Sequence, residues 1–183
     1  MQSDKLIEGL IEQTKQIISQ VEAIKNQELN SLTWKQKPDS WSILECLEHL
    51  NLYGYFYLPQ INEKINQSKT THQVDFKSGV LGNYFAQSML PKKKLNKMNT
   101  FKDKNPVNSN LNKTVIDTFL KQQHTIIDLL NRSKKVNLNK VKIATTLSRL
   151  IKLKLGDMFA FLINHNIRHF KQIERIQLAM SSQ

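Results

Sequence analysis

Glycine and proline are scarce in this chain, and their scarcity limits the folds that it can adopt. The 183 residues include 5 Gly and 4 Pro, where average usage would give about 13 and about 9. Sandwiches and barrels need many tight turns, which these two residues favour, so the composition argues against both folds. With 39% hydrophobic residues the chain can still bury a core, and its length suits one domain. We therefore predict a single domain over residues 1–183, built from a few long helices.

Apolar residues recur with helical spacing in four long stretches of the chain, at residues 4–26, 42–66, 111–130 and 156–179. Each stretch follows the i, i+3, i+4, i+7 pattern of an amphipathic helix. A shorter stretch at residues 80–90 ends before Pro91, because the residue that precedes a proline resists the helical region. Polar connectors separate the stretches. The simplest packing is all-α, an antiparallel four-helix bundle with a short extra helix and long polar connectors.

Two helix starts can be read from the sequence. Ser3 is placed to cap the first long helix. Ser42 is followed three residues later by Glu45, the spacing of a capping box, in which hydroxyl and carboxylate each accept a hydrogen bond from a backbone N–H. A Lys/Asn-rich loop at about residues 91–110 shows no periodicity. We expect this loop to be mobile and to lie apart from any metal site.

Two histidines interrupt the apolar stripe of the last helix. His165 and His169 follow Leu162 and precede Ile173 on that stripe, and because they are four residues apart their rings lie one above the other. Burying two imidazoles costs free energy unless each finds a partner. A divalent metal would satisfy both, and histidines at i and i+4 are a recurring metal clamp. Hydrogen bonds to buried polar groups would also satisfy them, so the pair alone leaves both interpretations open.

A third histidine, His49, lies on the second long helix but away from its main apolar stripe. It shares a second, more aromatic face with Glu45, Leu52, Tyr53 and Phe56. A helix with two apolar faces is expected to be contacted on both, here by the core and by a pocket or partner subunit. This pattern favours a homodimer. The same spacing also allows an exposed histidine beside an aromatic patch.

Two short motifs resemble the DinB-like superfamily, a family of damage-inducible four-helix bundles that is distinct from the DNA polymerase sharing its name. The first motif is Trp-Ser at 41–42 with a histidine eight residues after the tryptophan. The second is His-x-x-x-His-x-x-Gln, which begins at residue 165. The resemblance covers most of the chain in order and spacing, and it is less clear between about residues 67 and 110. It implies an up-down-down-up bundle that holds a divalent ion.

Carried over, the resemblance makes His49, His165 and His169 the three metal ligands. Three histidines leave coordination positions open, which is typical of catalytic sites. All-imidazole sites suit several transition metals, of which we expect Zn or Ni. Characterised members of the family are similar in transferring low-molecular-weight thiols, such as bacillithiol or mycothiol, to electrophiles. The resemblance therefore implies a metal-dependent transferase or hydrolase, with a small-molecule substrate and a low-molecular-weight thiol as co-substrate.

Several other residues could take part in such a site. Glu45 lies one turn before the histidine of its helix and could act as a catalytic base, although its capping role already explains it. Gln172 could bond a ligand histidine or link two helices. Cys46, the single cysteine, is most simply an inert apolar side chain. We expect His72 and His124 to lie in solvent.

The chain carries a net charge of +12, from 27 basic and 15 acidic residues. Only 4 of the basic residues are Arg, the residue that best reads phosphates and guanines, so we expect diffuse charge and no specific nucleic-acid partner. No stretch reaches the ~18 apolar residues that span a bilayer, and no signal segment is visible, so we expect a cytoplasmic protein without a membrane partner. The alternative function is a non-enzymatic bundle whose basic loop binds an acidic partner. That loop contains Lys92, Lys93, Lys94, Lys97, Lys102 and Lys104.

Overall fold

The computed structural model of this chain describes residues 1–91 and 100–182. These residues form mostly helices, which confirms the prediction of an all-α fold. In chain order the elements are α1 (Ser3–Lys25), α2 (Leu29–Thr33), α3 (Ile43–Asn66), α4 (Val80–Met89), the 3₁₀ helix η1 (Lys102–Lys104), α5 (Thr114–Ser133), β1 (Lys142–Ala144), β2 (Lys152–Lys154) and α6 (Leu155–Ser181). The sequence predicted the long helices and α4 to within a few residues. It did not predict α2 or the two strands, which lie in connectors expected to be irregular.

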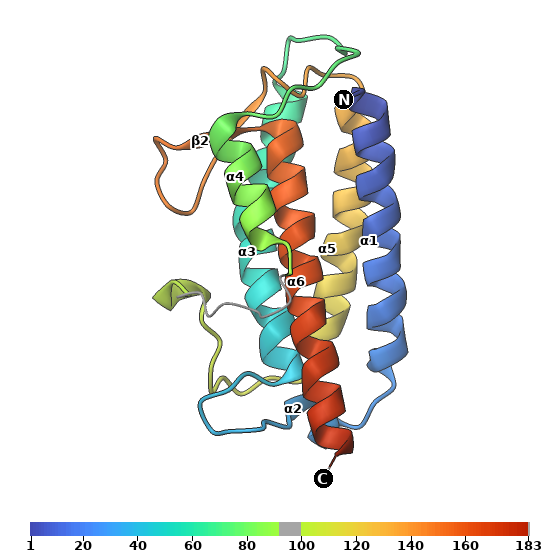
Figure 1. Ribbon diagram of the computed structural model, residues 1–183, viewed down its shortest axis with the longest axis vertical. Coiled ribbons are helices and arrows are strands. Elements are labelled where there is room, and N and C mark those ends of the chain that lie inside the picture. The colour runs from blue at the N-terminus through green and yellow to red at the C-terminus, as the bar shows by residue number, and fades with distance from the viewer. Residues whose placement is uncertain (92–99, 183) are drawn as a thin grey trace.

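The long helices of the described residues, α1, α3, α5 and α6, lie side by side (Figure 1). Both α3 and α1 pack against α5 and α6, so that α1 and α3 occupy opposite corners of the arrangement. α1 and α6 run away from the end that carries the strands, and α3 and α5 run toward it (Figure 1). The shorter α4 packs along α6. The α3–α6 contact is the one that matters for the site below.

The apolar stripes of the long helices meet between them and form the core. On α1 the fully buried stripe consists of Ile7, Leu10, Ile17, Val21 and Ile24, and on α3 it includes Ile43, Leu47, Leu50, Leu58, Ile61 and Ile65. Burying one such side chain contributes about 1.5–3 kcal/mol relative to leaving it exposed. The core therefore holds the long helices in a fixed rotation about their axes, which decides which side chains face one another.

Of the two predicted caps, the structure contains one. At the start of α3, the Glu45 N–H donates to Ser42 Oγ (3.2 Å) and the Ser42 N–H donates to Glu45 Oε2 (2.8 Å), which is the predicted capping box. The predicted cap at Ser3 is wrong. Ser3 is the first residue of α1, and its hydroxyl donates instead to the Gln73 carbonyl at 2.7 Å, because residues of the α3–α4 connector lie against the start of the chain.

The carboxylate of Asp157, in the first turn of α6, holds the start of α4. It accepts hydrogen bonds from the Ser78 hydroxyl and from the Gly79 N–H (2.9 Å), both of which precede or begin that helix. Gly82 allows this close approach, since a Cβ atom there would lie 2.2 Å from Asp157 Oδ2. The contact fixes α4 against α6 about two turns before the histidines of α6.

A small hairpin precedes α6, where the sequence predicted a polar connector. β1 and β2 pair antiparallel with Ile143 opposite Leu153, and both of these side chains are buried. The Tyr57 hydroxyl on α3 accepts a hydrogen bond from the Thr146 N–H (3.0 Å) and so ties the hairpin loop to the helices. Three alternating residues per strand are too few for their periodicity to stand out in the sequence.

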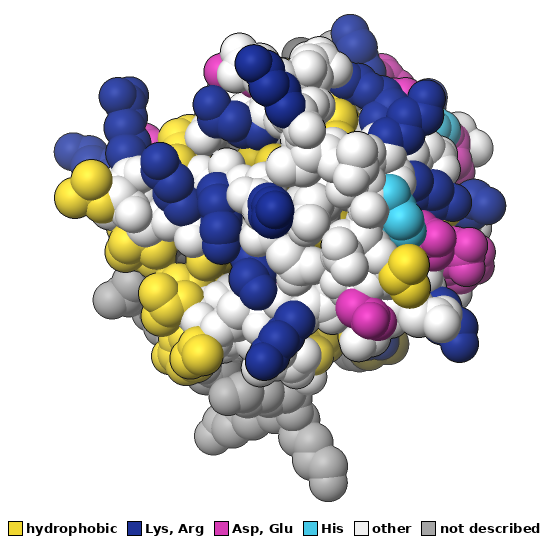
Figure 2. Space-filling model, turned by 90° about the horizontal axis from the view of Figure 1, so that it is seen from above, with side chains coloured by type: hydrophobic (Ala, Val, Ile, Leu, Met, Phe, Trp, Pro, Cys, Tyr) yellow, Lys and Arg dark blue, Asp and Glu magenta, His cyan; other side chains and the backbone are white. Residues whose placement is uncertain are grey.

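Basic side chains are spread over the end of the molecule that carries the hairpin, among polar and apolar groups (Figure 2). Lys142, Arg149 and Lys152 of the hairpin are exposed there. Leu150, in the hairpin loop, is also exposed. Among the described residues, none of the helices combines the length and the apolar character needed to cross a bilayer.

Candidate metal centre

His49 lies in the second turn of α3, and His165 and His169 lie one turn apart in the middle of α6. The capping box fixes where α3 begins and therefore which side of the helix His49 occupies. All three side chains are buried, with exposed fractions of 3%, 6% and 8%. The sequence left open whether His49 lies at the surface, and the structure places it inside, facing α6.

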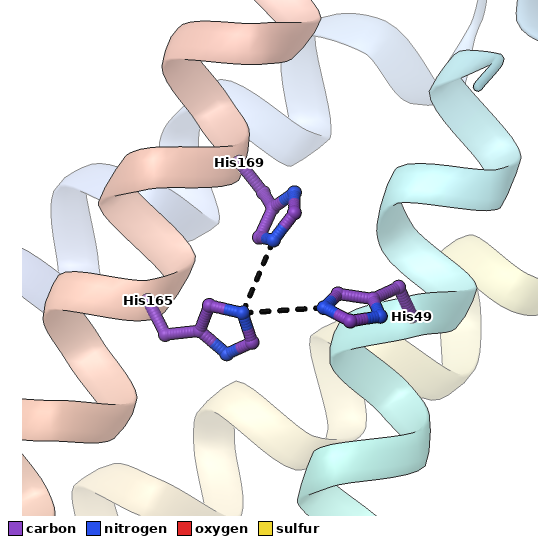
Figure 3. A group of neighbouring side chains, drawn as sticks. All are labelled: His49, His165 and His169. Carbon is purple, nitrogen blue, oxygen red and sulfur yellow. Dashed lines mark hydrogen bonds between the residues drawn. The ribbon is translucent and has the colours of Figure 1, made fainter. Parts of the chain in front are cut away.

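The three imidazole rings converge on one point between α3 and α6 (Figure 3). Nε2 of His165 lies 3.2 Å from Nε2 of His49 and 3.1 Å from Nε2 of His169. One nitrogen from each ring lies within 4.8 Å of the others. With Zn–N bonds of ~2.0–2.1 Å, two nitrogens that share a tetrahedral ion lie about 3.3 Å apart. The prediction that these three histidines come close enough to share one ion is confirmed.

The outer nitrogens of two rings are held by hydrogen-bond acceptors. Nδ1 of His49 lies 2.6 Å from the Lys104 carbonyl oxygen, and Nδ1 of His169 lies 3.1 Å from Gln172 Oε1. Both acceptors are oxygens without a proton, so each Nδ1 carries the hydrogen and donates it. In the neutral rings of His49 and His169, Nε2 then carries no proton, and its lone pair is directed into the centre. Metal-binding histidines in proteins are commonly oriented in this way.

Burial favours the neutral form of all three imidazoles. It lowers the pKa of His49 to about 4, although the hydrogen bond to the Lys104 carbonyl opposes the shift. Burial, followed by the proximity of a neighbouring histidine, holds the pKa values of His165 and His169 well below the usual 6.5. The centre is therefore uncharged at neutral pH.

Three neutral rings cannot satisfy one another in this arrangement. The lone pairs on Nε2 of His49 and His169 both point at Nε2 of His165, which has at most one proton to donate. At least one pair of nitrogens therefore meets lone pair to lone pair in a buried setting, which is unfavourable. A cation at the point of convergence would accept all three lone pairs at once. The donor set, its tautomers and its spacing fit a divalent metal ion.

Aromatic rings enclose the centre. Trp41, which precedes the α3 cap, stacks on His169 at a centroid distance of 5.7 Å and lies 4.7 Å from His49. Tyr53, one turn after His49 on α3, lies 4.8 Å from the ring of His165. Burial raises the pKa of Tyr53 to about 12, so its phenol stays protonated at neutral pH. These rings cover the histidines and help to bury their nitrogens.

A comparison with models of protein families matches residues 10–173 to the DinB superfamily. The chain belongs to the DinB superfamily. Neither the comparison with curated proteins nor that with solved structures gave a match. The matched range contains all three histidines, and proteins of the DinB superfamily bind metal ions. The family and the buried three-histidine group together fit a metal-binding site.

Glu45, the candidate catalytic residue, is buried and fully engaged in hydrogen bonds. Besides its capping contacts with Ser42, its Oε1 accepts hydrogen bonds from Lys35 Nζ (2.7 Å) and from the Asn108 N–H (2.6 Å). An open cavity of about 290 Å³ lies beside it, lined by Thr33, Lys35, Ser42, Glu45, Asn108, Ser109, Asn110 and Leu111. These hydrogen bonds are sufficient to explain why the Glu45 carboxylate is buried. The part of Glu45 in catalysis stays a prediction.

The Lys/Asn-rich loop is closer to the site than the sequence indicated. Its Lys92, Lys93, Lys94 and Lys97 lie outside the described residues, while Lys102 and Lys104 form η1. Because the Lys104 carbonyl accepts a hydrogen bond from His49 Nδ1, the expectation that the loop lies apart from the metal centre is wrong for its described part. Sequence reasoning could not find this contact, since a backbone carbonyl is common to every residue type.

The remaining candidates follow their expectations. Gln172 bonds the His169 ring, one of the two roles considered for it. Cys46 is fully buried, and burial raises the pKa of its thiol, which keeps it protonated and unreactive. His72 and His124 are exposed. The second face of α3 is covered within this chain by α6 and η1, so the pattern that favoured a homodimer has an explanation inside one subunit.

Proposed function

We propose that this chain is a metal-dependent enzyme whose divalent ion, Zn or Ni, is held by His49, His165 and His169. One observation carries the proposal: three buried imidazoles converge while the outer nitrogens of two of them donate to fixed oxygens. That arrangement directs lone pairs at one point, where a single cation would accept all three. We also propose that the long helices form an up-down-down-up four-helix bundle, with the ion between α3 and α6.

The proposed reaction transfers a low-molecular-weight thiol to a small electrophile, or hydrolyses a small electrophile. A three-histidine ion with open positions supplies Lewis acidity, which lowers the pKa of a bound thiol or water. The chain's own residues supply the setting: the Lys104 carbonyl and Gln172 fix the ligand tautomers, and Trp41 limits the access of water. Tyr53, whose phenol keeps its proton, can donate a hydrogen bond to a substrate oxygen or sulfur.

The proposal is tested by assaying metal-reconstituted protein with a set of small thiols and a chromogenic electrophile. Wild-type protein and a His124→Gln control should give metal-dependent turnover, and His165→Gln should lose it, because His124 is exposed and is not a member of the three-histidine group. Equal rates in wild type and His165→Gln would contradict the proposal. Glu45→Gln keeps a capping side chain. If Glu45 acts as a catalytic base, this variant should keep the metal and lose turnover, and unchanged turnover would contradict that role.

The partners and the location of the protein stay predictions. We expect a small-molecule substrate, a cytoplasmic location, no membrane partner and no specific nucleic-acid partner. The homodimer considered from the sequence stays an untested prediction. Light scattering tests the dimer directly, with the monomer mass of 21.3 kDa as the contradicting result. In the alternative, a non-enzymatic bundle whose basic loop binds an acidic partner, the histidines are structural or hold a metal incidentally, and no metal-dependent turnover is expected.

A further inference from the structure

A segment of the long loop is tied to the metal centre and to the start of α3. We call residues 101–110 the strap. Lys104 contributes its carbonyl to His49 Nδ1 (2.6 Å), and Asn105 Oδ1 accepts a hydrogen bond from Trp41 Nε1 (3.2 Å). Asn108 contributes its N–H to Glu45 Oε1 (2.6 Å). The strap therefore contacts one metal-site histidine, the tryptophan that stacks on His169 and lies against His49, and the cap of the helix that carries His49.

The strap decides which nitrogen of His49 faces the centre. A neutral imidazole carries one proton, and its position follows the hydrogen bond that the ring can make. With the Lys104 carbonyl in place, Nδ1 keeps the proton and Nε2 offers its lone pair to the centre. Without that carbonyl, the ring is free to rotate and to exchange tautomers, so His49 becomes a poorer ligand. The same interaction also works in reverse, because an ion on Nε2 makes the Nδ1 proton a stronger donor.

The strap is held mainly by polar contacts and buries little of its own surface. Most of its residues are exposed, and Pro106 is its buried member. Asn108 adopts a positive φ of 61°, a conformation that most residues avoid but asparagine tolerates. The amide of Asn108 and its side-chain oxygen, which accepts from Lys35 Nζ (2.9 Å), provide the anchor at this end. Segments held by polar contacts with little buried apolar surface open more easily than a core does.

We propose that docking of the strap and metal binding at the three histidines are coupled, with the Lys104 carbonyl as a positioning group for His49. The inference rests on the proposed metal site and adds a partner for it within the chain. Coupling between two events is reciprocal. A docked strap raises the affinity for the ion, and the ion raises the fraction of molecules with a docked strap. Loss of a comparable outer contact to a ligand histidine lowers metal affinity by about 10–100-fold.

Two substitutions at one exposed position separate strap docking from side-chain chemistry. Asn108→Pro removes the N–H that Glu45 accepts and fixes φ near −65°, which excludes the observed φ of 61°. Asn108→Gly keeps the N–H and tolerates the positive φ, and it loses only the bond to Lys35. Zinc affinity is measured for both and for wild type by competition with a chelating indicator, with circular dichroism as the check on folding.

We expect Asn108→Pro to bind zinc about 10–100-fold more weakly than wild type and Asn108→Gly to stay within about 3-fold. Equal affinity in all three proteins would overturn the coupling while leaving the metal site intact. Failure of wild type itself to bind either zinc or nickel in this assay would overturn the proposed function and this inference together. The two failures are therefore distinguishable.

Hydrogen exchange of the wild type gives a test that needs no variant. Saturating zinc should slow exchange of the Asn108 amide by about 10–100-fold, the factor expected from the coupling. The amide of Thr145, bonded to the Ile151 carbonyl (2.9 Å) in the hairpin at the other end of the molecule, is the internal control and should change little. Zinc binding without slower exchange at Asn108 would overturn the coupling.

Discussion

The stability of the metal-free protein should fall steeply with acidification, because three buried histidines are neutral in the folded state. Their folded pKa values, about 4 for His49 and well below 6.5 for the others, lie under the unfolded value of ~6.5. The unfolded chain therefore binds more protons in this window, and the free energy of unfolding falls as the pH drops from about 6.5 toward about 4. At pH 5.5 each histidine lowers it by about 1.4 kcal/mol relative to pH 8, or about 4 kcal/mol for all three.

Urea unfolding in the presence of a chelator, at pH 8, 6.5 and 5.5, measures this loss. His165→Gln should reduce it to about 3 kcal/mol, since two of the three buried histidines remain. His124→Gln, at an exposed position, is the matched control and should keep the wild-type pH dependence. A loss below about 1 kcal/mol in wild type would refute the reasoning, because it would mean that the three rings are not held neutral by burial.

Three further predictions follow from the same structure. Bound metal should persist through dialysis at pH 5.5 and be lost near pH 4, because protons compete only near the lowered pKa of about 4; elemental analysis that finds complete loss at pH 5.5 would contradict this. Gly82→Ala should destabilise by about 1–3 kcal/mol through its clash with Asp157, while Gly9→Ala, where a Cβ meets nothing within 4 Å, should not; equal urea midpoints would count against the packing argument. Binding to duplex DNA should be weak, sequence-independent and steeply salt-dependent, and nanomolar binding to a defined sequence at physiological salt would show otherwise.

The sequence predicted the long helices well because their signals are local. The capping box at Ser42 and the apolar stripes depend on spacing within one helix, so they can be recognised without knowledge of the fold. The cap at Ser3 failed for the opposite reason. The Ser3 hydroxyl donates a hydrogen bond to the carbonyl of Gln73, a residue distant in sequence, and no local pattern around Ser3 indicates that partner. The hairpin was missed because each of its strands has only 3 residues.

The residues of the candidate site also fall into those with a local sequence signal and those without one. His165 and His169 were found because they interrupt an apolar stripe on one helix. His49 lies off the main stripe of α3, and periodicity could not tell whether its face meets α6 or solvent, so only the family resemblance joined it to the pair. The Lys104 carbonyl could not be predicted at all, because any residue at that position offers the same atom. Which loop reaches a site is a property of the packed fold.

Metal content tests the central claim most directly. Untagged protein is reconstituted with excess zinc, freed of unbound ion by gel filtration and analysed for metal per chain. The account predicts about one ion per chain in wild type and in His124→Gln, and far less in His165→Gln, because a site of two imidazoles binds much more weakly than one of three. A wild-type protein that emerges free of metal, or a His165→Gln variant that retains as much as wild type, would contradict the claim that His49, His165 and His169 form a metal centre.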